Sequence, residues 1–273
     1  MRELAEDLGH LRERPKQLQR TAESALRIRM QLPLLANRQA ERLSTDIPHD
    51  KRIFRDRREA GRLLAERLAG YRDQNLIVLA LPRGGVVVGY EVARALGAPL
   101  DVVVARKLGA PWQPELAVGA IAPRGVRVLN EDVLAWLDIS EDEVEQIASL
   151  EASEMERRMH LFRGDRPEPM LKGKTVILVD DGIATGMTVR AAIEYIGQHE
   201  PGHLVLAVPV CASGTAEVLR SEVDDLVSLK TPFELLAIGY WYEDFEQVSD
   251  EEVVELLERF RAAEGREAEE SDN

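Results

Sequence analysis

Apolar runs alternate along the chain with segments whose apolar residues recur every three to four positions. Six short runs stand out, and all are rich in Val, Leu and Ile: NLIVLALP (75–82), LDVVVARK (100–107), VRVL (126–129), KTVILV (174–179), HLVLAVPV (203–210) and DLVSL (225–229). Runs of this length, bounded by turn residues, predict strands. The longer ones are apolar without interruption, which is typical of parallel strands buried on both faces.

The segments between these runs predict helices. Helical spacing is found in 60–68, 86–97, 140–162 and 250–263, and in two helices that start near Thr188 and Gly214. Gly70 and Gly97 are stop signals after the first two helices. Ser140, with Glu143 three residues later, has the pattern of an N-terminal capping box. The Pro- and Gly-containing segment 106–125 shows no regular pattern.

Strands that alternate with helices predict an α/β fold, with a Rossmann-like parallel sheet flanked by helices. We expect this domain to span residues 53–262. Residues 1–52 are rich in Arg, Gln, Leu and Ala with loose helical spacing, and they predict a helical N-terminal arm. The acidic end, 263–273, predicts a disordered tail.

Composition narrows the classes of function. The formal charge of -14 and the pI of about 5.0 argue against a general nucleic-acid binder. Cys211 is the single cysteine in 273 residues, so no internal disulfide or cysteine-based metal site can form. No apolar run approaches the ~18 residues of a membrane helix, and the first residues lack a signal peptide's apolar block. We therefore expect a cytoplasmic protein without a membrane partner.

The stretch KTVILVDDGIATGMT, 174–188, carries the clearest chemistry. Asp180 and Asp181 end a buried strand, where an α/β sheet binds its ligand. The two glycines that follow allow close backbone approach, and the next helix presents free amides at its positive end. The acids can accept from vicinal hydroxyls or from a hydrated magnesium ion. A site that can bind a phosphate, a vicinal diol and a metal ion is suited to a sugar phosphate.

Three other interpretations of this stretch fit less well. A Walker A loop requires a lysine after its second glycine, where this chain has Met187. An aspartyl phosphotransfer site of D-x-D type would separate its acids by one residue. A turn with a helix cap would explain one acid and one glycine, but not the remaining pattern.

VILVDDGIATGMT resembles the phosphoribosyl diphosphate (PRPP) binding motif of type I phosphoribosyltransferases. The resemblance implies that Asp180 and Asp181 hold the ribose 2- and 3-hydroxyls, and contact Mg²⁺ through PRPP and water. It also implies that a five-residue loop wraps the 5-phosphate: Ala184, Thr185, Gly186, Met187 and Thr188. Some members that act on 6-oxopurines carry an aspartate in place of Ala184, whereas adenine-using members are more similar to this chain there.

Two further segments are similar to this family. LPRGG lies where the family places its diphosphate loop, which implies that Arg83, Gly84 and Gly85 bind diphosphate, although a tight turn also explains Arg-Gly-Gly. The segment starting at Arg106 and Lys107 resembles the family's mobile loop. Their cations would bind diphosphate or form surface salt bridges. Glu115 in this loop is a candidate to stabilise a developing cation or to move a proton.

The late stretch TPFELLAIGYWYEDF, 231–245, gathers aromatic residues in a chain with only 5% of them. In this family a small hood of C-terminal residues covers the acceptor base, which makes Trp241 and Tyr242 the candidates for stacking on it. Packing of the hood against the sheet is the competing explanation. The region 54–253, including FRDRREAG and YWYEDFEQVSDEEV, resembles a bacterial group described only as predicted phosphoribosyltransferases.

These resemblances predict a magnesium-dependent enzyme that transfers phosphoribose from PRPP to a nucleobase-like acceptor and releases diphosphate. Asp180, Asp181 and Glu115 are the catalytic candidates. The alternative is a PRPP-binding regulatory or sensor protein without efficient turnover. The sequence leaves the acceptor, the purpose of the N-terminal arm and the oligomeric state open, with a homodimer as one option.

Overall fold

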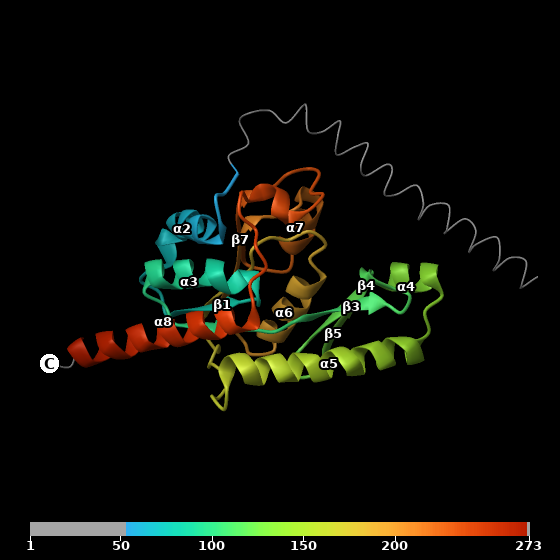
Figure 1. The fold of residues 1–273 in the computed structure, drawn as a ribbon, viewed down its shortest axis with the longest axis horizontal. Helices are drawn as coiled ribbons and strands as arrows, with labels where there is room; N and C mark the ends of the chain where they lie inside the picture. The colour runs from blue at the N-terminus through green and yellow to red at the C-terminus, as the bar shows by residue number, and fades with distance from the viewer. Residues whose placement is uncertain (1–52, 272–273) are drawn as a thin grey trace, which may run out of the picture. The chain divides into compact units, whose positions relative to one another are not determined.

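A computed structural model describes residues 53–271 of the chain. The predicted helical arm, residues 1–52, lies outside the described residues. Figure 1 shows the described part as a parallel sheet with helices on both sides and a smaller sheet toward one end. Within 53–271, no helix combines the length and the apolar character needed to cross a membrane.

The main sheet confirms the predicted α/β fold. Its strands are β1 (Leu76–Ala80), β2 (Leu100–Val102), β6 (Thr175–Val179), β7 (His203–Val210) and β8 (Asp225–Lys230). They are hydrogen-bonded in the order β2-β1-β6-β7-β8, and every pair is parallel. All five residues of β1 and of β6 are buried, as their uninterrupted apolar runs predict.

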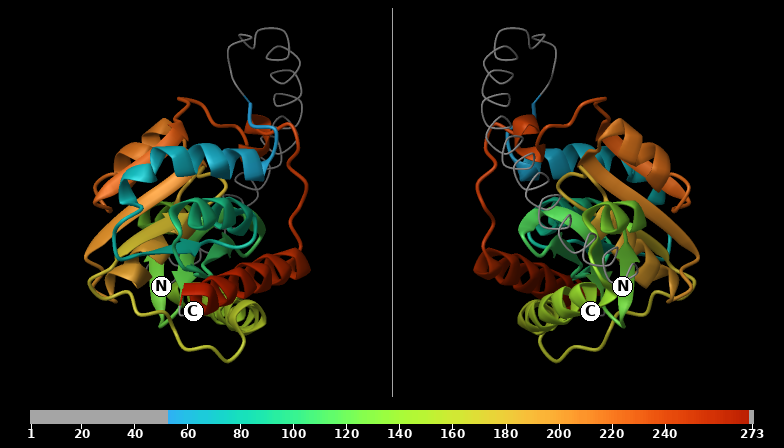
Figure 2. Two further views of the ribbon diagram at one scale, coloured as in Figure 1. Left: turned by 90° about the vertical axis from the view of Figure 1, so that its left-hand side faces the viewer. Right: turned by 90° about the vertical axis from the view of Figure 1, so that its right-hand side faces the viewer.

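Alternate residues of the central strands bury into different cores. Val78 and Ile177 belong to the core formed with the helices α2 (Arg57–Arg67), α3 (Gly84–Leu96), α5 (Glu141–Arg163) and α8 (Asp250–Ser271). Ile77 and Leu178 point to the opposite core, formed with α6 (Met187–Gly197) and α7 (Ser213–Leu219). The α8 helix lies alongside α3 and α5, as both figures of the fold show (Figures 1 and 2).

A second, antiparallel sheet was not expected from the sequence. It consists of β3 (Arg106–Ala110), β4 (Gln113–Ala122) and β5 (Val126–Leu129). The run LDVVVARK, read as one strand, is in fact divided: β2 ends at Val102 and Arg106 starts β3. The segment 106–125, expected to be a loop, forms a hairpin whose pairing is irregular around Gly109. That irregularity, with Pro111 and Pro114, explains why the sequence shows no strand-like alternation of apolar and polar residues in this segment.

Two local signals at helix ends are confirmed. Ser140 and Glu143 form the predicted capping box at the start of α5, and Gly97 ends α3 with a φ of 64°. The short α4 (Glu131–Leu137) was not predicted, and neither were the 3-10 turns η1 (Ala69–Tyr71) and η2 (Ile238–Trp241). The α8 helix continues to Ser271, through most of the segment for which the composition predicts disorder.

Cys211, which follows β7, is expected to be unreactive in the folded protein. The residue is fully buried, and burial raises the pKa of its thiol to about 11, so that hardly any thiolate forms at pH 8. Treatment with dithionitrobenzoate at pH 8 should release no chromophore from the native chain, and one equivalent after unfolding in guanidinium. Fast release from the native protein would contradict the buried position.

Candidate functional site

The strand order creates a switch point between β1 and β6. From β1 the chain continues to β2 on one side, and from β6 it continues to β7 on the other. The loops that follow β1 and β6 therefore diverge at the carboxyl edge of two neighbouring strands, which is where open α/β sheets bind ligands. These two loops are LPRGG and DDGIATG, the segments that the sequence singled out.

The two loops touch one another. A Cβ atom added to Gly84 would lie 1.9 Å from Asp181 Oδ2. One added to Gly85 would lie 2.9 Å from the Val179 carbonyl oxygen and 3.0 Å from the Cα of Asp180. Real Cβ atoms do not approach so closely. At position 85 the neighbouring atoms belong to the backbone, so glycine is required, whereas a side chain at position 84 would displace the Asp181 and Arg57 side chains. The Arg-Gly-Gly turn is therefore packed directly against the paired aspartates.

The loop after the aspartates leads into the amino end of α6. Gly186 caps this helix with a φ of 76°, a left-handed conformation that favours glycine, and no side chain caps the first amides. Ala184 and Thr185 are exposed, and Thr215 Oγ1 donates to the Ala184 carbonyl oxygen at 2.6 Å. Uncapped amides at the positive end of an 11-residue helix are suited to an anionic ligand.

Asp180 and Asp181 are half-buried and differ in their partners. Asp180 Oδ1 accepts from the Asp181 backbone N–H at 2.8 Å. Burial and the neighbouring Asp181 carboxylate raise the pKa of Asp180 well above its ordinary value. Asp181 Oδ2 instead accepts from Arg57 Nε at 2.7 Å. One acid of the pair is thus compensated by a cation from α2.

The three cations assigned to diphosphate are each near an acid in the structure. Arg83 Nη1 lies 3.7 Å from Asp250 Oδ1, at the start of α8. Arg106 Nη2 is 2.6 Å from Glu151 Oε2 on α5. Lys107 Nζ is 3.1 Å from Glu115 Oε2 across the β3–β4 hairpin, with the Glu115 side chain 93% exposed. Of these cations, Arg83 is the one that belongs to the loop contacting the aspartates.

The hood residues are arranged differently from the stacking platform that the sequence suggests. Tyr242 is 5% exposed, and its ring lies between Phe54 and Phe245, with centroid distances of 5.4 and 5.0 Å. Its hydroxyl donates to the Asp181 carbonyl oxygen at 2.6 Å. In this conformation the Tyr242 ring is packed against other aromatic rings, and its hydroxyl holds the backbone of the aspartate loop. Tyr242 therefore supports that loop, and its ring faces are not available for stacking on a base. The neighbouring Trp241 ends η2 and is half-buried.

The sequence analysis missed the N-terminal half of this support. Phe54 pairs with Tyr242 in an isolated parallel bridge, and its N–H donates to the Trp241 carbonyl oxygen at 2.8 Å. Arg57 follows in the same segment. Phe54 and Tyr242 are 188 positions apart in the chain. The available signal was the resemblance of both FRDRREAG and YWYEDF to the same bacterial group, although no function was assigned to FRDRREAG.

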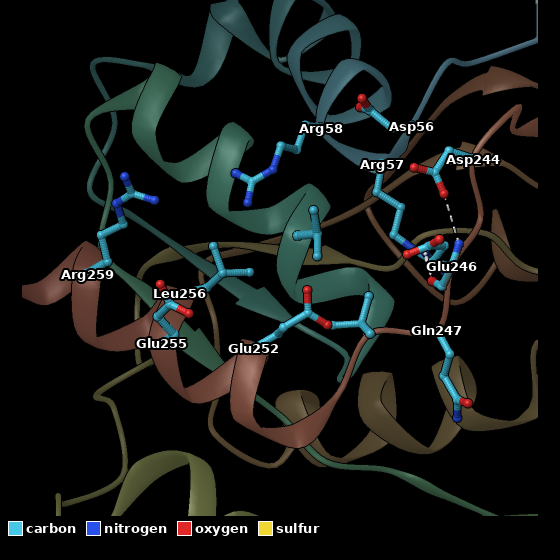
Figure 3. Close-up of a pocket in the computed structure, with 12 residues that line it drawn as sticks. Asp56, Arg57, Arg58, Asp244, Glu246, Gln247, Glu252, Glu255, Leu256 and Arg259 are labelled. Carbon is cyan, nitrogen blue, oxygen red and sulfur yellow. Dashed lines mark hydrogen bonds between the residues drawn. The ribbon is translucent and has the colours of Figure 1, made fainter.

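A polar cavity of about 280 Å³ lies beside this support, between α2, α3, α8 and the segment 244–248 (Figure 3). Arg57, Arg58 and Arg259 contribute its positive charges, and its acids include Glu246 and Glu252. The aspartate pair and the loop 184–188 do not line it. The cavity is therefore adjacent to the candidate site without including the loops at the switch point.

The chain matches the family model described as the phosphoribosyl transferase domain over residues 50–241. This match covers more than half of the sequence and includes both loops at the switch point. The chain belongs to the phosphoribosyl transferase domain family. The predicted membership of the phosphoribosyltransferase family is thereby confirmed.

Relatives of this phosphoribosyl transferase domain point the same way. Two Mycobacterium tuberculosis proteins, from strains CDC 1551 and H37Rv, are 45% identical over 208 residues and are named as candidate phosphoribosyl transferases. The match covers 76% of this chain, and the chain spans about half (47%) of the length of these curated relatives. The crystal structure of TT1426 from Thermus thermophilus is 42% identical, with a TM-score of 0.65, over 76% of this chain and 99% of that one.

Replacing Tyr242 with phenylalanine is expected to destabilise the domain. The change leaves the half-buried Asp181 carbonyl oxygen without its 2.6 Å donor, which costs about 1 to 2 kcal/mol and lowers Tm by roughly 2 to 8 °C. Thermal unfolding followed by circular dichroism measures the effect. Tyr240→Phe is the control, since that side chain is 66% exposed. Equal Tm values for both variants would refute the supporting role of Tyr242.

Proposed function

We propose that this domain transfers a 5-phosphoribosyl group from PRPP to a nitrogenous base and releases diphosphate. The observation that carries the proposal is the contact of Gly84 and Gly85 with the paired aspartates, beside the uncapped amino end of α6. A single ligand lying across this edge would need a phosphate at one end, a diol in the middle and a second anionic group at the Arg83 turn. PRPP has these three parts in that order.

In the proposed reaction each segment has a separate task. The amides and hydroxyls of 184–188 hold the 5-phosphate, and the Asp180 and Asp181 carboxylates accept from the ribose hydroxyls. Arg83 and the amides that open α3 bind the diphosphate. Breaking the bond between ribose C1 and diphosphate leaves positive charge on the sugar, so the site acts by positioning and by electrostatic stabilisation. The β3–β4 hairpin, with Lys107 and Glu115, is the proposed closing segment.

The proposed cofactor is Mg²⁺. Within 53–271, no group of three or more His, Cys, Asp or Glu side chains is arranged to hold a metal ion. Two adjacent carboxylates fit an ion that arrives with the substrate, since Mg²⁺ keeps several waters and binds through one or two carboxylates plus phosphates. When bound, the ion would neutralise charge on the departing diphosphate.

The test is an assay of diphosphate release with radiolabelled PRPP and Mg²⁺, against a panel of purines, pyrimidines and nicotinate-like acceptors. Release with one acceptor, and a matching labelled nucleotide, supports the transferase. Tight PRPP binding without release for any acceptor would favour the alternative, a PRPP-binding regulatory protein. Absence of PRPP binding in calorimetry would refute both. Thr185→Ala should weaken PRPP binding, because it removes a hydroxyl from the phosphate loop.

A further inference from the structure

Arg57 is the first residue of α2, and three contacts fix its side chain at the edge of the sheet. Its Nε donates to Asp181 Oδ2 at 2.7 Å, and its Nη1 donates to the Glu246 carbonyl oxygen at 2.8 Å. Its guanidinium carbon lies 3.8 Å from the centre of the Phe245 ring, a favourable cation–π distance. Figure 3 shows the side chain extending from α2 toward Glu246.

The ion pair of Arg57 with Asp181 lies where the two ligand loops meet. A Cβ atom on Gly84 would be 2.7 Å from Arg57 Nε, as well as 1.9 Å from Asp181 Oδ2. The pair is also largely removed from water, with side chains 11% and 14% exposed. Burying an ion pair costs desolvation free energy, so a partly buried pair is weak support for a purely stabilising role. Its position beside both loops instead indicates a role in the site.

The geometry restricts the Asp181 carboxylate. A carboxylate accepts through two oxygens, and Arg57 bonds to one of them from a side chain that is itself held by Glu246 and Phe245. The backbone of Asp181 is held separately, by the Tyr242 hydroxyl on its carbonyl oxygen. Side chain and main chain of this one residue are thus both fixed by the converged segments 54–57 and 242–246.

Arg57 also balances charge at the aspartate pair. Asp180 and Asp181 are adjacent, half-buried and of like charge, and such neighbours repel one another. A guanidinium at 2.7 Å compensates one of the two charges and keeps a fixed fork geometry.

We propose that Arg57 is a positioning residue for phosphoribosyl transfer, one that holds the Asp181 carboxylate in the orientation that receives the ribose hydroxyls. The inference rests on the proposed function. It adds a residue from the N-terminal FRDRREAG segment, outside both ligand loops, and explains why that segment converges with the YWYEDF segment at this edge.

The test is calorimetric titration of PRPP with Mg²⁺ into the full chain and three variants. Arg57→Gln is expected to raise the Kd for PRPP at least tenfold with unchanged stoichiometry. Arg57→Lys should recover part of the affinity, because it keeps the charge but cannot donate to Asp181 and Glu246 as a fork. Arg62→Gln, the same change at an exposed position of α2, should bind like the wild type.

Thermal unfolding separates positioning from simple destabilisation. A pair that only stabilised the fold would, when broken, lower Tm but leave the Kd unchanged in protein that is still folded at the titration temperature; that result would overturn the inference. A Kd for Arg57→Gln equal to that of the wild type would overturn it as well, and would leave the proposed function intact. A wild-type chain that does not bind PRPP would overturn the proposed function, and this inference with it.

A double-mutant cycle provides an independent check. If Arg57 acts through Asp181, Arg57→Gln should weaken PRPP binding less than threefold in an Asp181→Asn background. A full tenfold loss in that background would mean that Arg57 acts elsewhere, and would contradict the assigned role.

Discussion

Gly84→Ala is expected to reduce PRPP affinity by about 100-fold, equivalent to about 2.8 kcal/mol. The new Cβ atom would overlap Asp181 Oδ2 and Cγ, at 1.9 and 2.6 Å, and approach Arg57 Nε at 2.7 Å. These side chains would have to move, and with them the carboxylate proposed to bind ribose. Titration calorimetry with PRPP and Mg²⁺ measures the loss.

The fold should tolerate this substitution. Gly84 opens α3 without a left-handed φ, and alanine favours helices over glycine. Gly214→Ala is the matched control, because a Cβ atom there meets nothing within 4 Å. Both variants should keep the wild-type far-ultraviolet circular dichroism. Wild-type PRPP affinity in Gly84→Ala would refute the contact between the two loops as the ligand site.

Asp181→Asn is expected to weaken PRPP binding tenfold or more. The substitution preserves shape but replaces a charged acceptor with a neutral amide, and hydrogen bonds to charged groups are about twice as strong as neutral ones. It also leaves the Arg57 guanidinium, 11% exposed, without its anionic partner, so a lower Tm should accompany the lower affinity. Calorimetry and thermal unfolding report the two effects separately.

Asp73→Asn is the control for this change. Asp73 is exposed in the turn before β1, at the opposite end of the strand from the candidate site. It should change neither PRPP affinity nor Tm. If Asp181→Asn and Asp73→Asn bound PRPP with equal affinity, Asp181 would not belong to the proposed site, whatever the Tm values of the two variants.

The convergence of distant segments gives the hood a different role from the one that its aromatic content suggests. Tyr242 and Phe245 pack against Phe54 and Arg57, below the aspartate loop. Phe233 and Tyr240, from the same stretch, are 89% and 66% exposed. The exposed rings are therefore the ones with faces available to a planar acceptor in this conformation.

The sequence by itself determined the strands of the main sheet, the longer helices and the two loops proposed to bind the ligand. Uninterrupted apolar runs predicted β1, β6 and β7, because strands buried on both faces leave no polar position. Ser140 and Gly97 marked helix ends through interactions within a few residues. The DDGIATGMT stretch was recognisable for the same reason: its acids, glycines and threonines lie within one short segment.

Only the tertiary structure decided which distant residues complete the site. Arg57 and Asp181 are 124 positions apart, and nothing in either segment specifies the other as its partner. The burial of Tyr242 depends on Phe54, and the close fit of Gly84 depends on Asp181. The β3–β4 hairpin likewise forms through pairing that its irregular sequence does not reveal. Local patterns encode local hydrogen bonds and periodicity, whereas these contacts arise when packing of the two cores brings remote segments to one edge of the sheet.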